Sequence, residues 1–463
     1  MKIKLVTNAN EGLRNELSDI VRAFNPYMDL DLESEEYISV FFADSLGRIQ
    51  LSSSFEKEVT IDFSVDHLSE SQVKKEYKRY SKSGLYRYIS NHLNVKLPYG
   101  SLTGIRPTKM YYDLQLEEKN PLSTLCNFFD VSEEKANLIE RVVRTQSDVY
   151  GKETNRFDSF INIPFCPTRC SYCSFICDVV DRVKGKLEKY VESLILDIKE
   201  EKKIMKGLPR SIYVGGGTPT SIPLKLLEEI LTAIDAKGQE FTVEAGRADT
   251  LNSDVLALMK EKKVSRISVN PQTFKDSTLQ LIGRKGDSAS VLSAYALSRN
   301  YGFDINMDLI SGLPQESFED FKRSIDMAID LSPENITVHS LSLKRGSILT
   351  QSGYTNDDLE CVLKQNQYAV SSLLKAGYSP YYMYRQKNTV GRLENVGYAK
   401  AGKVCVYNVD NMEETHTIYA SGAGAISKRV DGNLITRLAE AKDISLYSSR
   451  IEEYIQRKKE FFS

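Results

Sequence analysis

The second half of the chain alternates short apolar runs with longer amphipathic stretches. From about residue 158 the apolar runs have the length of strands, and the stretches between them have the 3.6-residue spacing of helices. Alternating strands and helices build βαβ units, which share one parallel sheet. The predicted strands cover 159–163, 211–214, 241–244, 266–269, 304–309 and 335–339, and the predicted helices cover 186–204, 222–235, 252–262, 288–299, 316–330 and 357–376. Six such units predict a partial barrel or an open, doubly wound sheet.

The flanking regions follow different patterns. Residues 1–150 mix strand-like and helix-like patterns, at 38–44, 59–65, 71–93 and 132–144. After about residue 380 the sequence becomes rich in Tyr and Gly, and it ends in a charged tail of helical spacing over 437–461. We therefore predict an N-terminal α+β domain over 1–150, the α/β barrel over 158–385, and a C-terminal extension over 386–463 that covers the substrate.

Composition and charge narrow the class of protein. The 463 residues are 41% hydrophobic and carry a formal net charge of −2, as in an ordinary globular protein. No basic arm indicates nucleic acid. No run approaches the ~18 apolar residues of a membrane span, and the first residues lack the apolar core of a signal peptide. A cytoplasmic location is the expectation.

Four of the seven cysteines crowd into residues 166–177. Cys166, Cys170 and Cys173 have C-x3-C-x2-C spacing and follow the first predicted strand, at the end where βα folds place their chemistry. Three thiolates at this spacing can hold three irons of a [4Fe–4S] cluster and leave the fourth iron open. The alternatives are inert buried thiols, or zinc with Cys177 as a fourth ligand, although structural zinc commonly uses two separated ligand pairs.

The string INIPFCPTRCSYCSF at 161–175 resembles the radical S-adenosylmethionine (SAM) superfamily. It is similar in particular to the oxygen-independent coproporphyrinogen III oxidases, and the segments 102–109, 381–388 and 422–425 look like the HemZ type of that group. The resemblance implies a partial (β/α)6 barrel of the TIM-like radical SAM type and a [4Fe–4S] cluster on the three cysteines. It also implies that SAM binds the open iron and is cleaved to a 5′-deoxyadenosyl radical.

Further motifs follow in the order of that superfamily, each at the end of a predicted strand. Three successive glycines let a ligand approach the backbone closely, and an arginine fork suits a carboxylate. Singly, the same residues could be a tight turn or solvated charges. The resemblance assigns SAM to Gly215, Gly216, Gly217, Thr218, Glu244, Gln272, Arg284 and Asp308. It places the methionine amino group at the glycines, its carboxylate at Arg284, and the ribose hydroxyls at Gln272 and Asp308.

The implied reaction is oxidative decarboxylation of two propionates of coproporphyrinogen III, giving protoporphyrinogen IX. The implied partners are a tetrapyrrole substrate and a reducing protein such as flavodoxin or ferredoxin. Two positions depart from the decarboxylases: Phe175 stands where they have a fourth cysteine, and Phe160 where they have a tyrosine. The alternatives are a haem-binding chaperone, for which His339 and His416 are the histidines after the cysteine motif, and a tetrapyrrole methyltransferase. No residue is assigned a catalytic role in the attack on the substrate.

Overall fold

The computed structural model describes most of the chain in two compact units. The described residues are 1–25, 27–43, 47–175, 177–344, 346–356, 358–386, 389, 392–432 and 434–463. Contacts within the chain separate Met1–Val143, the front unit, from Arg144–Ser463, the barrel unit. Each unit is described by itself.

The front unit is a five-stranded sheet with helices, in the strand order β2-β1-β3-β4-β5. Alternation along β1 and β4 directs Ile3, Leu5, Ile49 and Leu51 into one core, which α1 and α2 complete. Its elements are β1 (Lys2–Thr7), α1 (Glu11–Ala23), β2 (Asp29–Leu30), β3 (Tyr37–Ala43), β4 (Arg48–Ser53), β5 (Val59–Asp62), α2 (Glu70–Leu93), α3 (Pro107–Leu116), α4 (Pro121–Asn127) and α5 (Glu133–Thr145).

Six parallel strands form the centre of the barrel unit, so the predicted partial (β/α)6 barrel is confirmed. Each observed strand starts and ends within two residues of its prediction, because each apolar run is buried on both faces of a parallel sheet. In spatial order they are β6 (Phe157–Ile163), β9 (Ser211–Gly216), β10 (Glu240–Val243), β11 (Arg266–Ser268), β12 (Asp304–Ser311) and β13 (Asn335–Ser340).

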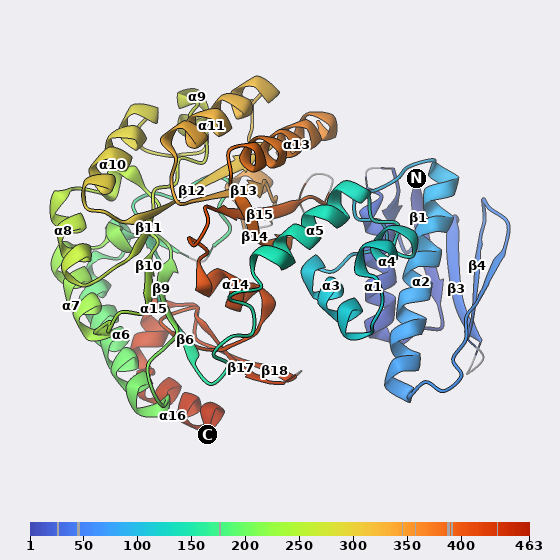
Figure 1. The fold of residues 1–463 in the computed structure, drawn as a ribbon, viewed down its shortest axis with the longest axis horizontal. Coiled ribbons are helices and arrows are strands. Elements are labelled where there is room, and N and C mark those ends of the chain that lie inside the picture. Colours follow the sequence, from blue (N-terminus) through green and yellow to red (C-terminus); the bar gives the residue numbers. More distant parts are fainter. Residues whose placement is uncertain are drawn as a thin grey trace. The chain divides into compact units, whose positions relative to one another are not determined.

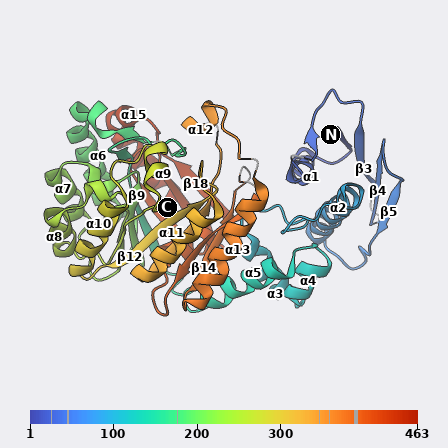
Figure 2. The same ribbon diagram turned by 90° about the horizontal axis from the view of Figure 1, so that it is seen from above.

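Helices cover the outer face of this curved sheet, as Figures 1 and 2 show. Most of the long helices connect successive parallel strands, which is the arrangement that βαβ units require, and α13 follows the last of these strands. They are α6 (Lys184–Ile204), α7 (Leu224–Ile234), α8 (Ser253–Glu261), α10 (Ser288–Asn300), α11 (Phe318–Leu331) and α13 (Leu359–Lys375), with the short α9 (Asp276–Leu281) and α12 (Ile348–Gln351) in loops.

Beyond β13 the chain adds five strands to the same sheet, which the sequence patterns did not predict. They are β14 (Ser379–Arg385), β15 (Glu394–Ala399), β16 (Thr417–Ser421), β17 (Ile426–Asp431) and β18 (Leu434–Ala439). The helical tail predicted over 437–461 was wrong at its start, since 437–439 belong to β18. β18 is the edge strand of the sheet, where charged side chains are tolerated and obscure the period-2 pattern. Helices α15 (Ile444–Ser449) and α16 (Ile451–Phe462) follow.

Helix α14 (Val406–Glu413) lies at the amino ends of the parallel strands. Glu240, the first residue of β10, accepts hydrogen bonds from the backbone N–H of Val406 at 3.1 Å and of Tyr407 at 3.3 Å. Arg266, the first residue of β11, donates to Glu240 at 2.9 Å and to the carbonyl of Lys403 at 2.9 Å. A carboxylate at a helix N-terminus is favourable, so these contacts fasten α14 beneath the barrel as a floor.

Candidate cofactor site

The cysteine motif lies in the loop after β6, at the carboxyl ends of the parallel strands. Cys166 ends the short strand β7 (Phe165–Cys166), which pairs with β8 (Asp178–Val179). Its Sγ lies 3.6 Å from Oγ1 of Thr218, while Arg247 donates to Sγ of Cys170 at 3.7 Å. A hydrogen bond from the N–H of Ser171 to the carbonyl of Ile282, at 2.9 Å, holds the loop to the barrel.

The thiols of this loop interact with one another. The Cys177 thiol donates hydrogen bonds to both Cys166 and Cys173, and this is the main cause that lowers the pKa of each, to about 6 for Cys173. The pKa of Cys177 is raised correspondingly. Metal ligands are thiolates, so the lowered pKa values of Cys166 and Cys173 favour metal binding by these two side chains.

No three of the described cysteine sulfurs lie as close together as the ligands of a bound zinc ion. Zinc holds sulfur ligands at about 2.3 Å, which brings the sulfurs to roughly 3.8 Å from one another. Among the described residues, the group of three or more His, Cys, Asp or Glu ligand atoms within 4.8 Å of one another is Asp158, Asp410 and His416, not the cysteines. That buried group lies at the floor, where Arg210 balances its charge at 3.2 Å from Asp410.

The three glycines lie where β9 ends, with Gly217 directly after the strand, and none of the three positions has room for a side chain. A Cβ on Gly216, whose φ is +103°, would lie 1.7 Å from Oδ1 of Asn162. A Cβ on Gly217 would lie 2.4 Å from the carbonyl oxygen of Phe165, and one on Gly215 would lie 2.7 Å from Oε2 of Glu244. The glycines therefore bring the strand end close to the cysteine loop and to Glu244 at once.

Glu244 follows β10 and points toward the same strand end. Tyr213 OH donates to its Oε1 at 2.5 Å, and the N–H of Gly216 donates to its Oε2 at 3.3 Å. Burial raises the pKa of Glu244 to about 7, and the charge of Asp308 adds to the rise. Glu244 is thus an acid whose ionisation depends on which cation or donor lies beside it.

Gln272 follows β11, and Asp308 lies within the neighbouring strand β12. The N–H of Gln272 donates to the carbonyl of Asp308 at 2.8 Å, and Gln272 has a positive φ of +67°. Asp308 accepts from the side-chain amides of Asn270 and Asn306, both at 2.7 Å. Although burial alone would raise it, the pKa of Asp308 is lowered, chiefly by His339, whose Nε2 lies 3.7 Å away. Asp308 is therefore a carboxylate held in one orientation.

Arg284 bridges the barrel and the cysteine loop. Its Nη1 donates to the carbonyls of Gly246 and Asn270, at 3.1 and 2.8 Å, and its Nη2 lies 3.4 Å from the hydroxyl of Tyr172 in the loop. The structure therefore gathers all eleven residues predicted for the cofactors around one end of the barrel.

Comparison with known proteins agrees with this geometry. The family model of the radical SAM superfamily matches residues 161–328. The oxygen-independent coproporphyrinogen-III oxidase-like protein HemZ of Bacillus subtilis is 34% identical to the chain, over 99% of this chain and 97% of HemZ. The chain belongs to the radical SAM superfamily, in the HemZ-like group. Proteins of this superfamily use a [4Fe–4S] cluster and SAM, so both predicted cofactors are confirmed at the level of the family.

Two further proteins are similar to this radical SAM chain. The structure of coproporphyrinogen III oxidase (HemN) from Escherichia coli matches with a TM-score of 0.53 and 21% identity, over 70% of this chain and 73% of HemN, and shares the fold. The haem chaperone HemW of Lactococcus lactis is 27% identical over 62% of this chain and 79% of its own. None of the described helices is long and apolar enough to cross a membrane.

Several buried polar atoms of the radical SAM site lack a hydrogen-bond partner, and they match the groups of these cofactors. Oε1 of Gln272, Nε of Arg284 and Oγ of Ser171 are buried and make no hydrogen bond. Buried polar atoms are normally paired, so unpaired ones at a site indicate a ligand. A molecule with an ammonium, a carboxylate and ribose hydroxyls would supply the missing partners, and the three cysteines would hold the cluster. The role of each residue stays a prediction.

Sequence reasoning missed several residues of the radical SAM barrel interior. Tyr213 lies two residues before the first of the glycines, and strand alternation alone would have placed it on the same face as Gly215. Asn306 precedes Asp308 by two residues and so shares its face. Tyr407 comes from α14, and no local signal could have placed it below the barrel.

The described part of segment 381–388, which resembles the HemZ type, is mostly buried. Tyr381 is fully buried and its hydroxyl accepts from Asn408 of α14 at 3.1 Å, while Tyr382 packs so closely on Gly397 that a Cβ there would lie 1.8 Å from its ring. Tyr384 is half-buried, and Lys387 lies outside the described residues. Among the described tyrosines of this segment, Tyr384 is the most open to a ligand.

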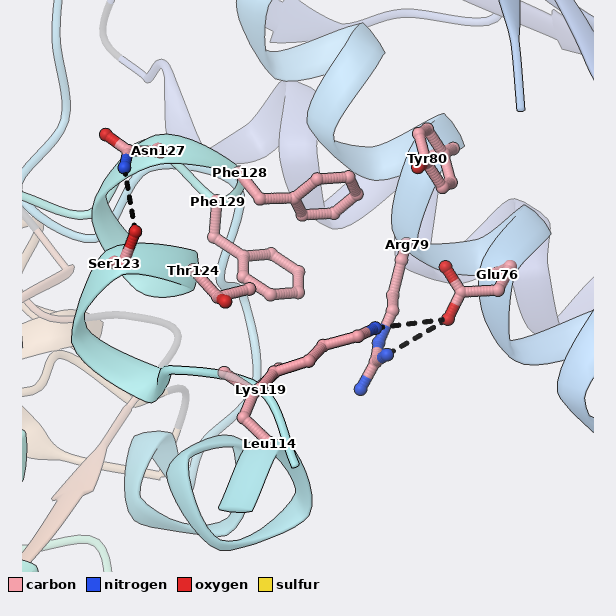
Figure 3. Close-up of a pocket in the computed structure, with 10 residues that line it drawn as sticks. All are labelled: Glu76, Arg79, Tyr80, Leu114, Lys119, Ser123, Thr124, Asn127, Phe128 and Phe129. Carbon is pink, nitrogen blue, oxygen red and sulfur yellow. Dashed lines mark hydrogen bonds and ion pairs between the residues drawn. The ribbon is translucent and has the colours of Figure 1, made fainter. Parts of the chain in front are cut away.

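The front unit contains a cavity of about 440 Å³, shown in Figure 3. Its charged side chains point toward one another beside the rings of Phe128 and Phe129. Arg79 donates to Glu76 at 3.0 Å and to Glu117 at 2.7 and 2.8 Å. These carboxylates already neutralise Arg79, so the cavity presents little free charge to a ligand.

Proposed function

We propose that this radical SAM protein oxidatively decarboxylates two propionates of coproporphyrinogen III to vinyl groups. The observation that carries the proposal is that the cysteine loop lies at the same end of the barrel as Glu244, Arg284 and Asp308, in a chain similar to HemZ along its whole length. When bound, the cluster and SAM supply a carbon-centred radical. Removal of one hydrogen atom from the propionate β-carbon, loss of CO2 and release of one electron to an external acceptor balance each decarboxylation.

The residues of the chain have separate tasks in this proposal. Cys166, Cys170 and Cys173 hold the cluster. Glu244 accepts the ammonium of SAM and Arg284 pairs with its carboxylate, because opposite charges in a site with little water interact strongly. Gln272 and Asp308 orient the ribose hydroxyls. The floor helix and the buried lumen exclude water, which protects a reactive radical.

The proposed setting follows from the same chemistry. A flavodoxin or ferredoxin would reduce the cluster, and the cytoplasm is the proposed location. The test is anaerobic incubation of the reconstituted protein with SAM, a reductant and coproporphyrinogen III. Protoporphyrinogen IX should form together with 5′-deoxyadenosine and CO2. Steady release of 5′-deoxyadenosine with no decarboxylated tetrapyrrole would refute the proposal.

A haem carrier is the second candidate. The similarity to HemW and the side chain of Phe175, which is 68% exposed beside the cluster loop, favour it. Of the two histidines considered for haem iron, His416 is buried at the floor with Asp410, whereas His339 is partly exposed at a strand end of the site. The carrier predicts stoichiometric haem binding that His339→Ala abolishes, with no turnover of coproporphyrinogen.

A further inference from the structure

Tyr213 makes the shortest hydrogen bond to Glu244. Tyr213 lies in the middle of β9, and its hydroxyl donates to Oε1 at 2.5 Å. Each oxygen of Glu244 therefore has a distinct environment. Oε1 accepts the hydrogen bond from Tyr213. Oε2 lies beside the glycines at the end of β9 and accepts one long hydrogen bond, at 3.3 Å from the N–H of Gly216.

The ring of Tyr213 packs against the floor helix α14. It stacks on Tyr407 of the floor helix with centroids 4.4 Å apart and planes at 22°, and Phe160 of β6 stacks on Tyr407 at 6.0 Å. Stacked rings of this kind restrict a side chain to one rotamer. The hydroxyl of Tyr213 is therefore held where it meets Glu244, by side chains from β6 and α14.

We infer that Tyr213 is a positioning residue of the SAM site, which holds Oε1 of Glu244 so that Oε2 faces the methionine ammonium. The inference rests on the proposed cofactor role of Glu244 and adds a residue that no motif assigns. A carboxylate free to rotate would lose this orientation, and a preorganised partner binds more tightly because less freedom is lost on binding.

The charges around Glu244 determine how the contact responds to pH. The groups that interact with it are Tyr213 and Gly216 of β9, Asp308 of β12, His339 of β13, Tyr384 of β14 and Tyr407 of α14. The bond from Tyr213 lowers the pKa of Glu244, whereas burial and Asp308 raise it. Removing the Tyr213 hydroxyl should therefore raise the pKa of Glu244. SAM binding requires the ionised carboxylate, so its loss on acidification should begin at a higher pH.

The experiment is the Tyr213→Phe variant, which keeps the ring stack and deletes one oxygen. Equilibrium binding of SAM to the anaerobically reconstituted protein is measured without tetrapyrrole from pH 6 to 9. A hydrogen bond to a charged group contributes enough that Kd for SAM should rise about tenfold at pH 7. The acid limb of the binding curve should also shift to higher pH. In the Glu244→Gln background the same change should have no further effect.

Tyr295→Phe is the matched control, because that buried hydroxyl donates to the carbonyl of Leu331 at 2.6 Å on an outer helix. Its SAM binding should equal that of the unaltered protein. Unchanged affinity and an unchanged pH limb in Tyr213→Phe would overturn the inference. So would loss of cluster iron together with affinity, since Tyr213 would then support the fold. Failure of tetrapyrrole decarboxylation would leave these binding results standing, and so would refute only the proposed function.

Discussion

The ammonium of Lys458 in the C-terminal helix lies 2.8 and 2.7 Å from the two carboxylate oxygens of Asp197 in α6. Both side chains are fully buried. The ammonium also donates to the carbonyl of Ala420 in β16, at 2.7 Å, and Tyr419 and Tyr447 donate to Asp197 at 3.0 and 2.7 Å. This network joins the last helix to α6 and to the strand that pairs with β6, which leads to the cysteine loop.

Lys458→Met should destabilise the protein by about 3–5 kcal/mol, because it leaves the buried carboxyl groups of Asp197 and Glu440 without the cation that they share. Urea unfolding of the reconstituted protein measures the loss. Lys459→Met is the control: that amine is half exposed and pairs with Glu200 at 3.2 Å, and such pairs contribute at most about 1 kcal/mol. Equal losses in the two variants would show that the buried pair adds nothing.

Replacing any one of Cys166, Cys170 or Cys173 by alanine should abolish the brown cluster absorption after reconstitution. Each supplies one of the three thiolates that hold the irons. Cys177→Ala should keep the absorption, and so should Cys126→Ala, in a helix of the front unit. Iron and sulfide content per chain checks all five variants. A cluster that is absent from Cys177→Ala would make that thiol a ligand and contradict the assignment of three.

The barrel could be predicted because each strand is encoded locally. In β6, β9 and β12 the apolar run, its turn and the functional residue at its end occupy neighbouring positions. The cysteines and glycines follow strands directly, so knowing the strands placed them at one edge of the sheet. Chain order and the rule that parallel strands end at one edge were sufficient for this part of the site.

The floor could not be predicted, because its contacts are distant in sequence. Glu240 and Val406 are 166 residues apart, and the bond between them is set by packing of α14 under β10. Tyr213 likewise contacts Glu244 across 31 positions. The Tyr-rich segment 381–384 likewise did not reveal that Tyr381 is buried, because its hydroxyl contacts Asn408 of α14, 27 positions away.

Gly216→Ala should abolish SAM binding while Gly207→Ala should not. Both glycines have a positive φ, +103° and +89°, so both variants carry backbone strain of about 1–2 kcal/mol. Only at Gly216 does the new methyl group meet another group, Oδ1 of Asn162, whereas nothing lies within 4 Å of a Cβ on Gly207. The melting temperature measures the backbone strain that both variants share, and equilibrium SAM binding measures the clash that only Gly216→Ala introduces. Normal SAM binding by Gly216→Ala would remove the glycine strand end from the cofactor site.

Glu201 in α6 should make the stability of the protein fall as pH rises. Burial raises its pKa in the folded protein to about 8, from 4.5. Between these values the folded protein keeps a proton that the unfolded chain has released. Unfolding therefore releases a proton, and each pH unit in that range removes about 1.4 kcal/mol of stability. Glu201→Gln carries no ionisable group, yet can still accept from Ser159, which donates to Glu201 at 2.7 Å. Urea unfolding is measured at pH 6, 7 and 8 at constant salt. The free energy of unfolding of the variant should rise relative to that of the unaltered protein at each step. Parallel curves would mean that Glu201 ionises in the folded protein near its ordinary pKa.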